Sequence, residues 1–151
     1  MPAAPIPSSA AAAANALAHR LGYLALLPFV LGALAIWFVR ADARGYATAA
    51  LSAYAAVIVA FLGGIHWGFG FRAGTPDARL FGWGVVPSLV ACTALLMQAS
   101  AALVIHGVML VACYLVDRKV YPRQGAAAWL TLRFRLTAVA ALSCFLGAAG
   151  S

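Results

Sequence analysis

The chain has 151 residues, of which 66% are hydrophobic and only 9% are charged. Soluble globular proteins carry about 25% charged residues, so this composition excludes an ordinary soluble domain and indicates a protein embedded in lipid. Five helices of roughly 20 residues would use about two thirds of the chain, which leaves no room for a separate soluble catalytic domain. The net charge of +7 does not indicate a nucleic-acid partner, because the basic residues stand between apolar runs.

The N-terminal segment, residues 1–20, is rich in Ala, Pro and Ser, and Arg20 is its only charged residue. We expect this segment to be a disordered tail. It lacks the basic leader of a secretory signal peptide. The alternatives are an Ala-rich helix that lies at the membrane surface and a weak organelle-targeting segment.

The remainder of the chain consists of apolar runs separated by short polar segments. These runs predict five transmembrane helices over residues 21–39, 46–71, 76–97, 101–118 and 128–149. Helices are expected because a lipid-exposed backbone must satisfy its hydrogen bonds internally, and the runs lack the alternation of barrel strands. The predicted fold class is therefore an all-α, polytopic membrane helix bundle.

Two of the predicted helices have informative ends. Before the third helix, Thr75 suits an N-cap, Pro76 suits the first helical position, and Asp77 is favoured near the positive end of the helix dipole. The fourth apolar run, residues 101–116, would span only about 24 Å at ~1.5 Å per residue. It must therefore extend into residues 117–120, thin the bilayer, or cross it obliquely.

Lys and Arg residues are divided unequally between the two ends of the predicted bundle. Arg40 and Arg44 lie at one end, whereas the other end carries Arg20, Arg72, Arg79, Arg118, Lys119, Arg123, Arg133 and Arg135. Cytoplasmic segments are enriched in Lys and Arg, so we expect a cytoplasmic N-terminus and a C-terminus on the outside.

The densest part of this basic end is the segment around the last polar loop. We expect its cationic side chains to contact the anionic head groups of the bilayer, and they are Arg118, Lys119, Arg123, Arg133 and Arg135. Docking of a protein partner is the alternative.

Small residues recur along one side of the second predicted helix. At steps of four residues they are Ser52, Ala56, Ala60, Gly64 and Gly68. Such a series lets another helix approach closely enough for backbone packing. We therefore expect these residues to form a helix-packing seam.

His66 is an ionisable residue within the second apolar run. It lies about 200° around the helix from the glycines of the seam, so the second helix should be buried on both sides and central in the bundle. An intramembrane ionisable group is a candidate ligand-binding or proton-handling residue, although a neutral, hydrogen-bonded His can be structural. We expect Pro28 and Pro87 to kink their helices. The candidate partners of His66 are the carbonyl groups that these prolines free, on Leu24 and Trp83, and the side chains of Tyr23, Tyr114 and Asp117.

The sequence predicts no catalytic residue, no metal site and no cofactor. A haem shared by His66 and His106 is disfavoured, because the two lie about 12 Å apart along the membrane normal. Cys92, Cys113 and Cys144 fall inside apolar runs without C-x-x-C spacing, which is typical of small packing residues. No nucleophile, phosphate-binding or dinucleotide motif is present.

Several segments of the chain resemble a known family. They are Leu27-Pro28-Phe29, Tyr54-Ala55-Ala56-Val57-Ile58, Gly63-Gly64-Ile65-His66-Trp67-Gly68, Trp83-Gly84-Val85-Val86-Pro87-Ser88, Tyr114-Leu115-Val116-Asp117-Arg118, and Trp129 with Leu132-Arg133. In this order they resemble the small membrane proteins grouped as domain of unknown function 3429, which include the eukaryotic transmembrane protein 69. The resemblance implies a multi-pass protein of a bacterial inner or mitochondrial membrane, without an assigned reaction.

Three functions from different classes follow from these observations. We expect first a non-enzymatic accessory or assembly protein of a membrane complex, which acts with a membrane-protein partner or as a homo-oligomer. The alternatives are a small proton-coupled or solute transporter that uses His66, and a protein that binds a lipid, quinone or cofactor in a pocket near Trp67, Trp83 and His66. The expected location is the bacterial cytoplasmic (inner) membrane, with no nucleic-acid partner.

Overall fold

The computed structural model describes residues 9–74 and 77–151. These residues form α1 (Ser9–Leu24), α2 (Leu27–Phe38), α3 (Ala41–Arg72), α4 (Ala78–Leu95), α5 (Ala99–Arg123), the short 3-10 helix η1 (Ala127–Trp129) and α6 (Leu130–Gly150). Within the described residues, five segments are long and apolar enough to cross a membrane, because α1 with α2 and η1 with α6 each count as one span. The prediction of an all-α bundle of five spans is confirmed.

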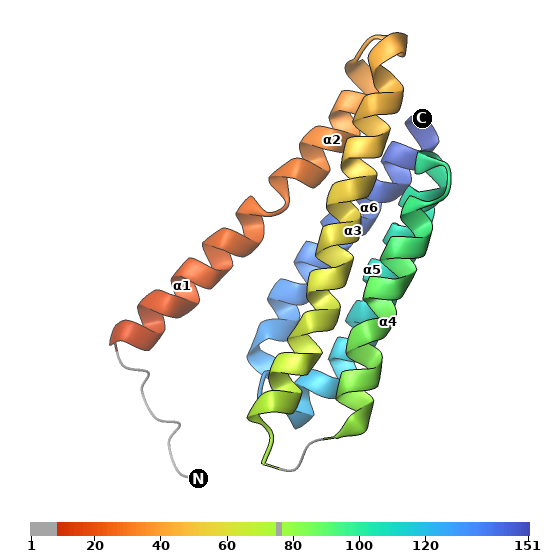
Figure 1. Cartoon of the computed structure of the whole chain (residues 1–151). Helices are drawn as coiled ribbons and strands as arrows, with labels where there is room; N and C mark the ends of the chain where they lie inside the picture. The colour runs from red at the N-terminus through yellow and green to blue at the C-terminus, as the bar shows by residue number, and fades with distance from the viewer. Residues whose placement is uncertain (1–8, 75–76) are drawn as a thin grey trace.

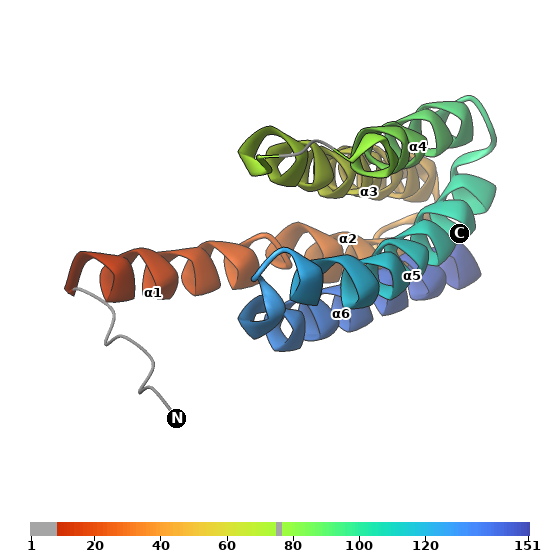
Figure 2. The same ribbon diagram turned by 90° about the horizontal axis from the view of Figure 1, so that it is seen from below.

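The bundle has two layers, with α3 and α4 on one side and α2, α5 and α6 on the other, while α1 extends outward from the second layer (Figures 1 and 2). Helix α3 contacts α2, α4, α5 and α6, so it is central, as expected. We call the end at which α3 and α5 finish and α4 and α6 begin the basic end. Arg72, Arg79 and Arg123 lie there.

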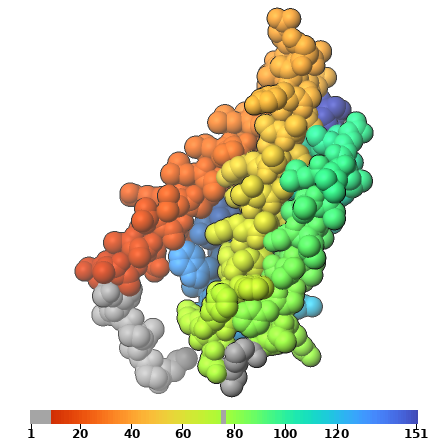
Figure 3. Space-filling view, viewed as in Figure 1, coloured from red at the N-terminus to blue at the C-terminus, as the bar shows by residue number. Residues whose placement is uncertain are grey.

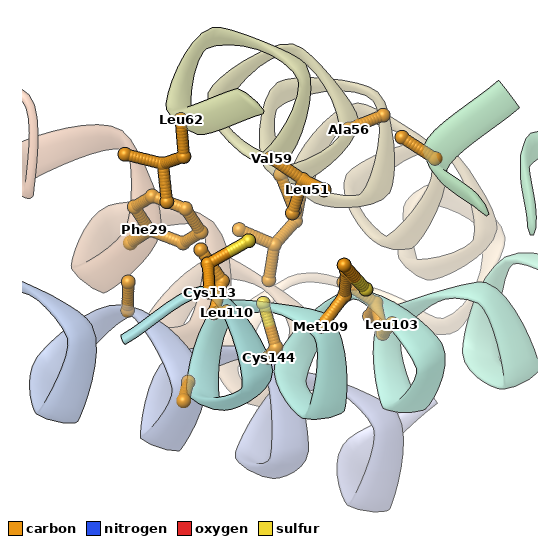
Figure 4. Close-up of a cluster of buried hydrophobic side chains, with 14 of the residues drawn as sticks. Phe29, Leu51, Ala56, Val59, Leu62, Leu103, Met109, Leu110, Cys113 and Cys144 are labelled. Carbon is orange, nitrogen blue, oxygen red and sulfur yellow. The ribbon is translucent and has the colours of Figure 1, made fainter. Parts of the chain in front are cut away.

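A continuous apolar core joins the two layers (Figure 4). Phe29 of α2, Val59 of α3, Leu110 of α5 and Cys144 of α6 are each at most 1% exposed. Cys113 is also buried in this core, whereas Cys92 is exposed on α4. Helices α2 to α6 therefore bury part of their apolar side chains and leave the rest on the outer surface, where lipid is the solvent.

The first span is broken between α1 and α2. Pro28 has no amide hydrogen to donate to the carbonyl of Leu24, and the helix is interrupted by a turn at Ala25 and Leu26. The Tyr54 hydroxyl of α3 donates a 2.8 Å hydrogen bond to the carbonyl oxygen of Ala25. This contact satisfies a backbone acceptor at the break and holds the junction against α3. By contrast, α4 continues through Pro87.

Three predicted helix ends can be compared with the structure. Helix α1 already begins at Ser9, so residues 9–20 are helical and the prediction of a disordered tail was wrong there; residues 1–8 lie outside the described residues. Asp77 is the N-cap of α4 and accepts a hydrogen bond from the amide of Arg79 at 2.9 Å, whereas the predicted roles of Thr75 and Pro76 lie outside the described residues. Helix α5 has 25 residues, so it extends past the apolar run, which was one of the expected solutions.

The close approach of α3 and α4 occurs at Gly63 and Gly84. A Cβ atom on Gly63 would clash with the carbonyl oxygen of Gly84, so the two backbones touch. In the predicted seam, Ser52 and Ala56 are buried, but a Cβ atom on Gly64 or Gly68 would meet nothing within 4 Å. Within the chain, Gly64 and Gly68 therefore make no close helix contact, because a series at steps of four residues drifts around the helix and faces outward near the basic end. Packing of another helix on these two glycines stays a prediction.

Candidate functional site

Three ionisable side chains from three helices meet inside the bundle near its basic end. His66 of α3, Asp117 of α5 and Arg133 of α6 are 1%, 1% and 9% exposed. His66 and Asp117 are each six residues from the end of their helix, which places them about 9 Å inside the basic end at ~1.5 Å per residue. We call these three residues the ion cluster.

Helical spacing brings the cluster together. Asp117 continues the buried stripe of α5 that runs through Leu110 and Cys113, and Arg133 begins the buried stripe of α6 that runs through Thr137 and Cys144. Positions three, four and seven residues apart lie on one face of a helix. Since the same stripes form the apolar core, the packing of α5 on α6 also fixes the two charged side chains opposite each other.

Arg133 and Asp117 form the tightest contact of the cluster. Nε of Arg133 donates a 2.8 Å hydrogen bond to Oδ2 of Asp117, and Nη2 lies 2.7 Å from the same oxygen. Charged side chains are seldom buried unless they are paired. Each of these two groups is therefore the counter-ion that makes burial of the other tolerable.

His66 lies between two oxygen atoms. Its Nε2 is 3.4 Å from Oδ1 of Asp117, and its Nδ1 is 3.3 Å from the carbonyl oxygen of Leu62. Both distances exceed the ~2.9 Å of a well-formed hydrogen bond, so His66 is held more weakly than Arg133. The ring also packs edge-on against Phe69 at 6.3 Å between centroids.

A groove opens beside the ion cluster, between α1 on one side and α3 and α6 on the other. It holds about 740 Å³ and is lined by Ala18, Leu21, Gly22, Ala25, Val57, Ile58, Phe61, Ile65, Phe69, Arg72, Tyr121, Gly125, Ala126, Trp129, Leu132, Arg133 and Leu136. We call it the α1 groove. In Figure 3 it is the hollow between α1 and α3, with α6 visible behind. Because most of its lining is apolar, the groove suits a hydrocarbon ligand.

The α1 groove and the ion cluster share one residue, Arg133. Its guanidinium group is paired with Asp117, and the residue also lines the groove. Tyr121 also lines the groove and is 4% exposed, and its ring packs edge-on against Phe69 at 5.3 Å. The wall of an otherwise apolar groove thus carries a paired cation near the basic end.

Helix α1 forms one wall of the groove and makes few contacts with the rest of the bundle. No residue of α1 is buried. Its neighbours are Trp129, which stacks on His19 at 5.3 Å between centroids, and Arg135, whose Nη1 donates to the hydroxyl of Tyr23 at 3.4 Å. An element with so little buried surface is held less firmly than the rest of the bundle.

The sequence matches the family described as Protein of unknown function (DUF3429) over residues 14–149. The chain belongs to this family. No curated protein and no solved structure significantly matches this DUF3429 protein. The matched residues include the ion cluster and the whole lining of the α1 groove. The family resemblance is confirmed, and the likeness to transmembrane protein 69 stays a prediction.

The sequence-predicted ligand residues of this DUF3429 protein separate into two places. His66 and Asp117 meet in the ion cluster, whereas Trp67 points toward α4 and donates a 3.0 Å hydrogen bond to the carbonyl oxygen of Phe81. Trp83 is packed against the apolar core. Neither tryptophan lines the α1 groove. Trp67 lines a separate pocket between α3 and α4, with Gly64, Gly84 and Ser88, and a ligand site near Trp67, Trp83 and His66 stays a prediction.

One of the predicted lipid head-group residues is not at the outer surface. Arg133 is buried and paired with Asp117, whereas the other four, Arg118, Lys119, Arg123 and Arg135, are exposed at the basic end. Arg133 and Arg135 are two residues apart and therefore face opposite sides of α6. This spacing indicates that only one of the two arginines can face lipid, because the other must face the interior of the bundle.

Sequence reasoning also missed Tyr121 and the apolar lining of the α1 groove. Asp117 could have indicated the ion cluster, because a carboxylate within a membrane span is usually paired with a cation. The spacing of α6 makes Arg133 the cation that shares its depth.

Proposed function

We propose that this DUF3429 protein binds a lipid-type molecule in the α1 groove. The observation that carries the proposal is the combination of an apolar groove of about 740 Å³ with a buried, paired cation on its wall. Ligand pockets commonly have volumes of roughly 300–1,000 Å³, with a mostly apolar lining and a few placed polar groups. A molecule with a hydrocarbon chain and a polar head matches both parts.

The position of the groove supports lateral entry from the bilayer. It lies between α1 and the body of the bundle and is open on its outer side (Figure 3). Helix α1 presents only small or aliphatic side chains to it, namely Ala18, Leu21 and Gly22. A hydrocarbon chain can therefore enter from surrounding lipid without passing through water.

The test of lipid binding is analysis of molecules that remain with the protein purified in a mild detergent. We expect lipid extraction and mass spectrometry to find a stoichiometric amphiphile, and Ala18→Trp, which fills the groove, to remove it. Ala16→Trp is the matched control, because Ala16 is exposed on the same helix and does not line the groove. Equal lipid content in both variants and the wild type would contradict the proposal.

A second candidate is proton-coupled transport, which the surroundings of His66 favour. Both ring nitrogens face oxygen acceptors, Oδ1 of Asp117 and the carbonyl of Leu62. A histidine placed between a carboxylate and a carbonyl oxygen inside a membrane-spanning bundle has the surroundings expected of a proton-relay residue.

Transport is tested by proton flux into proteoliposomes that contain a pH-sensitive dye. We expect His66→Gln to slow the flux at least about tenfold if His66 relays the proton, since removal of a proton-transfer group commonly costs 10²-fold or more. His19→Gln, on exposed α1, is the control. An equal rate in wild type and His66→Gln would exclude His66 from the transport step.

The accessory or assembly role expected from the sequence remains a prediction, and it is compatible with lipid binding. Native-expression complexes extracted in mild detergent provide the test. If this role is right, the protein migrates with a partner or a second copy rather than alone.

A further inference from the structure

We propose that the ligand of the α1 groove carries an anionic, phosphate-type head group that binds between Arg72 and Arg133. The inference rests on the proposed lipid-binding function and names its specificity. It assigns Arg133 and Arg72 as the residues that select the head group, with the hydrocarbon chain lying along α1 and α3.

Charge complementarity supports this assignment. The described lining of the groove contains two arginines, Arg72 and Arg133, and no carboxylate. Outside the lining, the exposed Arg20 and Arg135 stand on the two helices that flank the groove. Asp77 lies on α4, away from the groove, and Asp117 is already committed to Arg133. A negatively charged head group therefore meets an excess of positive charge.

Arg133 is the more constrained of the two arginines. Asp117 takes its Nε and Nη2 at 2.8 Å and 2.7 Å on a single oxygen, which fixes the plane of the guanidinium group. Arginine has five N–H donors in a rigid fork that matches phosphate oxygens. Tyr121, which also lines the groove, is hydrogen-bonded to the Arg133 side chain. A phosphate oxygen in the groove can accept from the donors that Asp117 and Tyr121 leave over.

Arg72 completes the site at the mouth of the groove. Its Nη2 donates a 3.1 Å hydrogen bond to the carbonyl oxygen of Gln124, which ties the end of α3 to the end of α5. The side chain is exposed, and its remaining donors are free to follow a head group. Depth agrees with this role, because the head groups of a bilayer lie at the ends of transmembrane helices.

The experiment compares two fluorescent lipids with identical chains, phosphatidylglycerol and phosphatidylcholine, bound to the purified full chain in neutral detergent and followed by anisotropy. We expect wild type to prefer phosphatidylglycerol at least about tenfold, the value of one charge-assisted hydrogen bond. Arg72→Gln should reduce this preference about tenfold, because it weakens binding of the net-negative phosphatidylglycerol more than binding of the net-neutral phosphatidylcholine. Arg79→Gln is the matched control, because Arg79 is exposed at the basic end but does not line the groove.

Arg133→Gln should abolish the preference for phosphatidylglycerol. If the Arg133→Gln variant fails to fold, Arg72→Gln alone tests the inference. Equal binding of both lipids by wild type, with Ala18→Trp blocking both, would overturn the head-group inference and keep the proposed function. Binding of neither lipid would overturn both. Displacement of the bound phosphatidylglycerol by millimolar inorganic phosphate would assign the site to a free anion and contradict a lipid head group.

Discussion

Arg133 reaches across the interface of α5 and α6 to place two of its nitrogens within 2.8 Å of a single carboxylate oxygen of Asp117. Both side chains lie within the membrane-spanning part of the bundle, and neither is more than 9% exposed. The pair therefore lies at the interface of the last two helices near the basic end, and through Arg133 it also forms part of one wall of the α1 groove.

Removing one partner of this pair should destabilise the bundle strongly. Asp117→Asn leaves the Arg133 guanidinium buried without its counter-ion, which typically costs about 3–5 kcal/mol. We expect a clearly lowered thermal midpoint in detergent, followed by circular dichroism. The double variant Asp117→Leu with Arg133→Met should recover most of the loss, because it leaves no unpaired charge. Arg135→Met, an exposed position on the same helix, should change the midpoint little.

The two adjacent glycines of α3 should respond differently to an added methyl group. Gly63→Ala places its Cβ against the Gly84 carbonyl and should cost about 1–3 kcal/mol through overpacking. Gly64→Ala meets nothing within 4 Å and should be neutral or stabilising by up to ~1 kcal/mol, because Ala favours helix over Gly. Unfolding in mixed micelles measures both. An equal loss of stability in the two variants would contradict a helix contact at Gly63 that excludes Gly64.

The break between α1 and α2 should loosen when Tyr54 loses its hydroxyl. Tyr54→Phe removes the 2.8 Å hydrogen bond to the carbonyl oxygen of Ala25 while keeping the edge-on ring contact with Phe29 at 5.1 Å. The expected cost is about 1 kcal/mol. Hydrogen exchange should then speed up in residues 18–26 and stay unchanged in α5. Unchanged exchange in α1 would show that the carbonyl contact does not hold the junction.

The orientation expected from the unequal distribution of Lys and Arg has a direct test. The start of α1 and the end of α6 lie at opposite ends of the bundle (Figure 1), as five crossings require. A reporter that is active only outside the cytoplasm should work when fused after Ser151 and fail when fused before α1. The reverse pattern would invert the assignment and place the basic end outside.

The number of spans was predictable because it depends on local hydrophobicity, which each apolar run carries by itself. The N-terminal tail shows the limit of that reasoning. Its Ala-rich composition is only a weak signal of a transmembrane helix, so we expected disorder. Ala nevertheless has the highest helix propensity, and residues from Ser9 onward form a helix that precedes α2.

The candidate site was only half predictable. His66 and Asp117 drew attention as ionisable groups inside apolar runs, since their burial is costly wherever the helices lie. Arg133 was expected at the lipid surface, because a cation near a helix end ordinarily extends to the head groups. Its actual direction depends on the rotation of α6 about its axis, which is set by packing against α5.

The amino-acid sequence by itself determined that this protein lives in a membrane, crosses it five times and carries its positive charge at one end, because hydrophobicity and charge act through each segment's own contact with lipid and water. The tertiary structure alone decided which helices touch, that Gly63 rather than Gly64 meets α4, and that Arg133 joins His66 and Asp117. These outcomes depend on helix rotation and tilt, which arise from the packing of several helices at once.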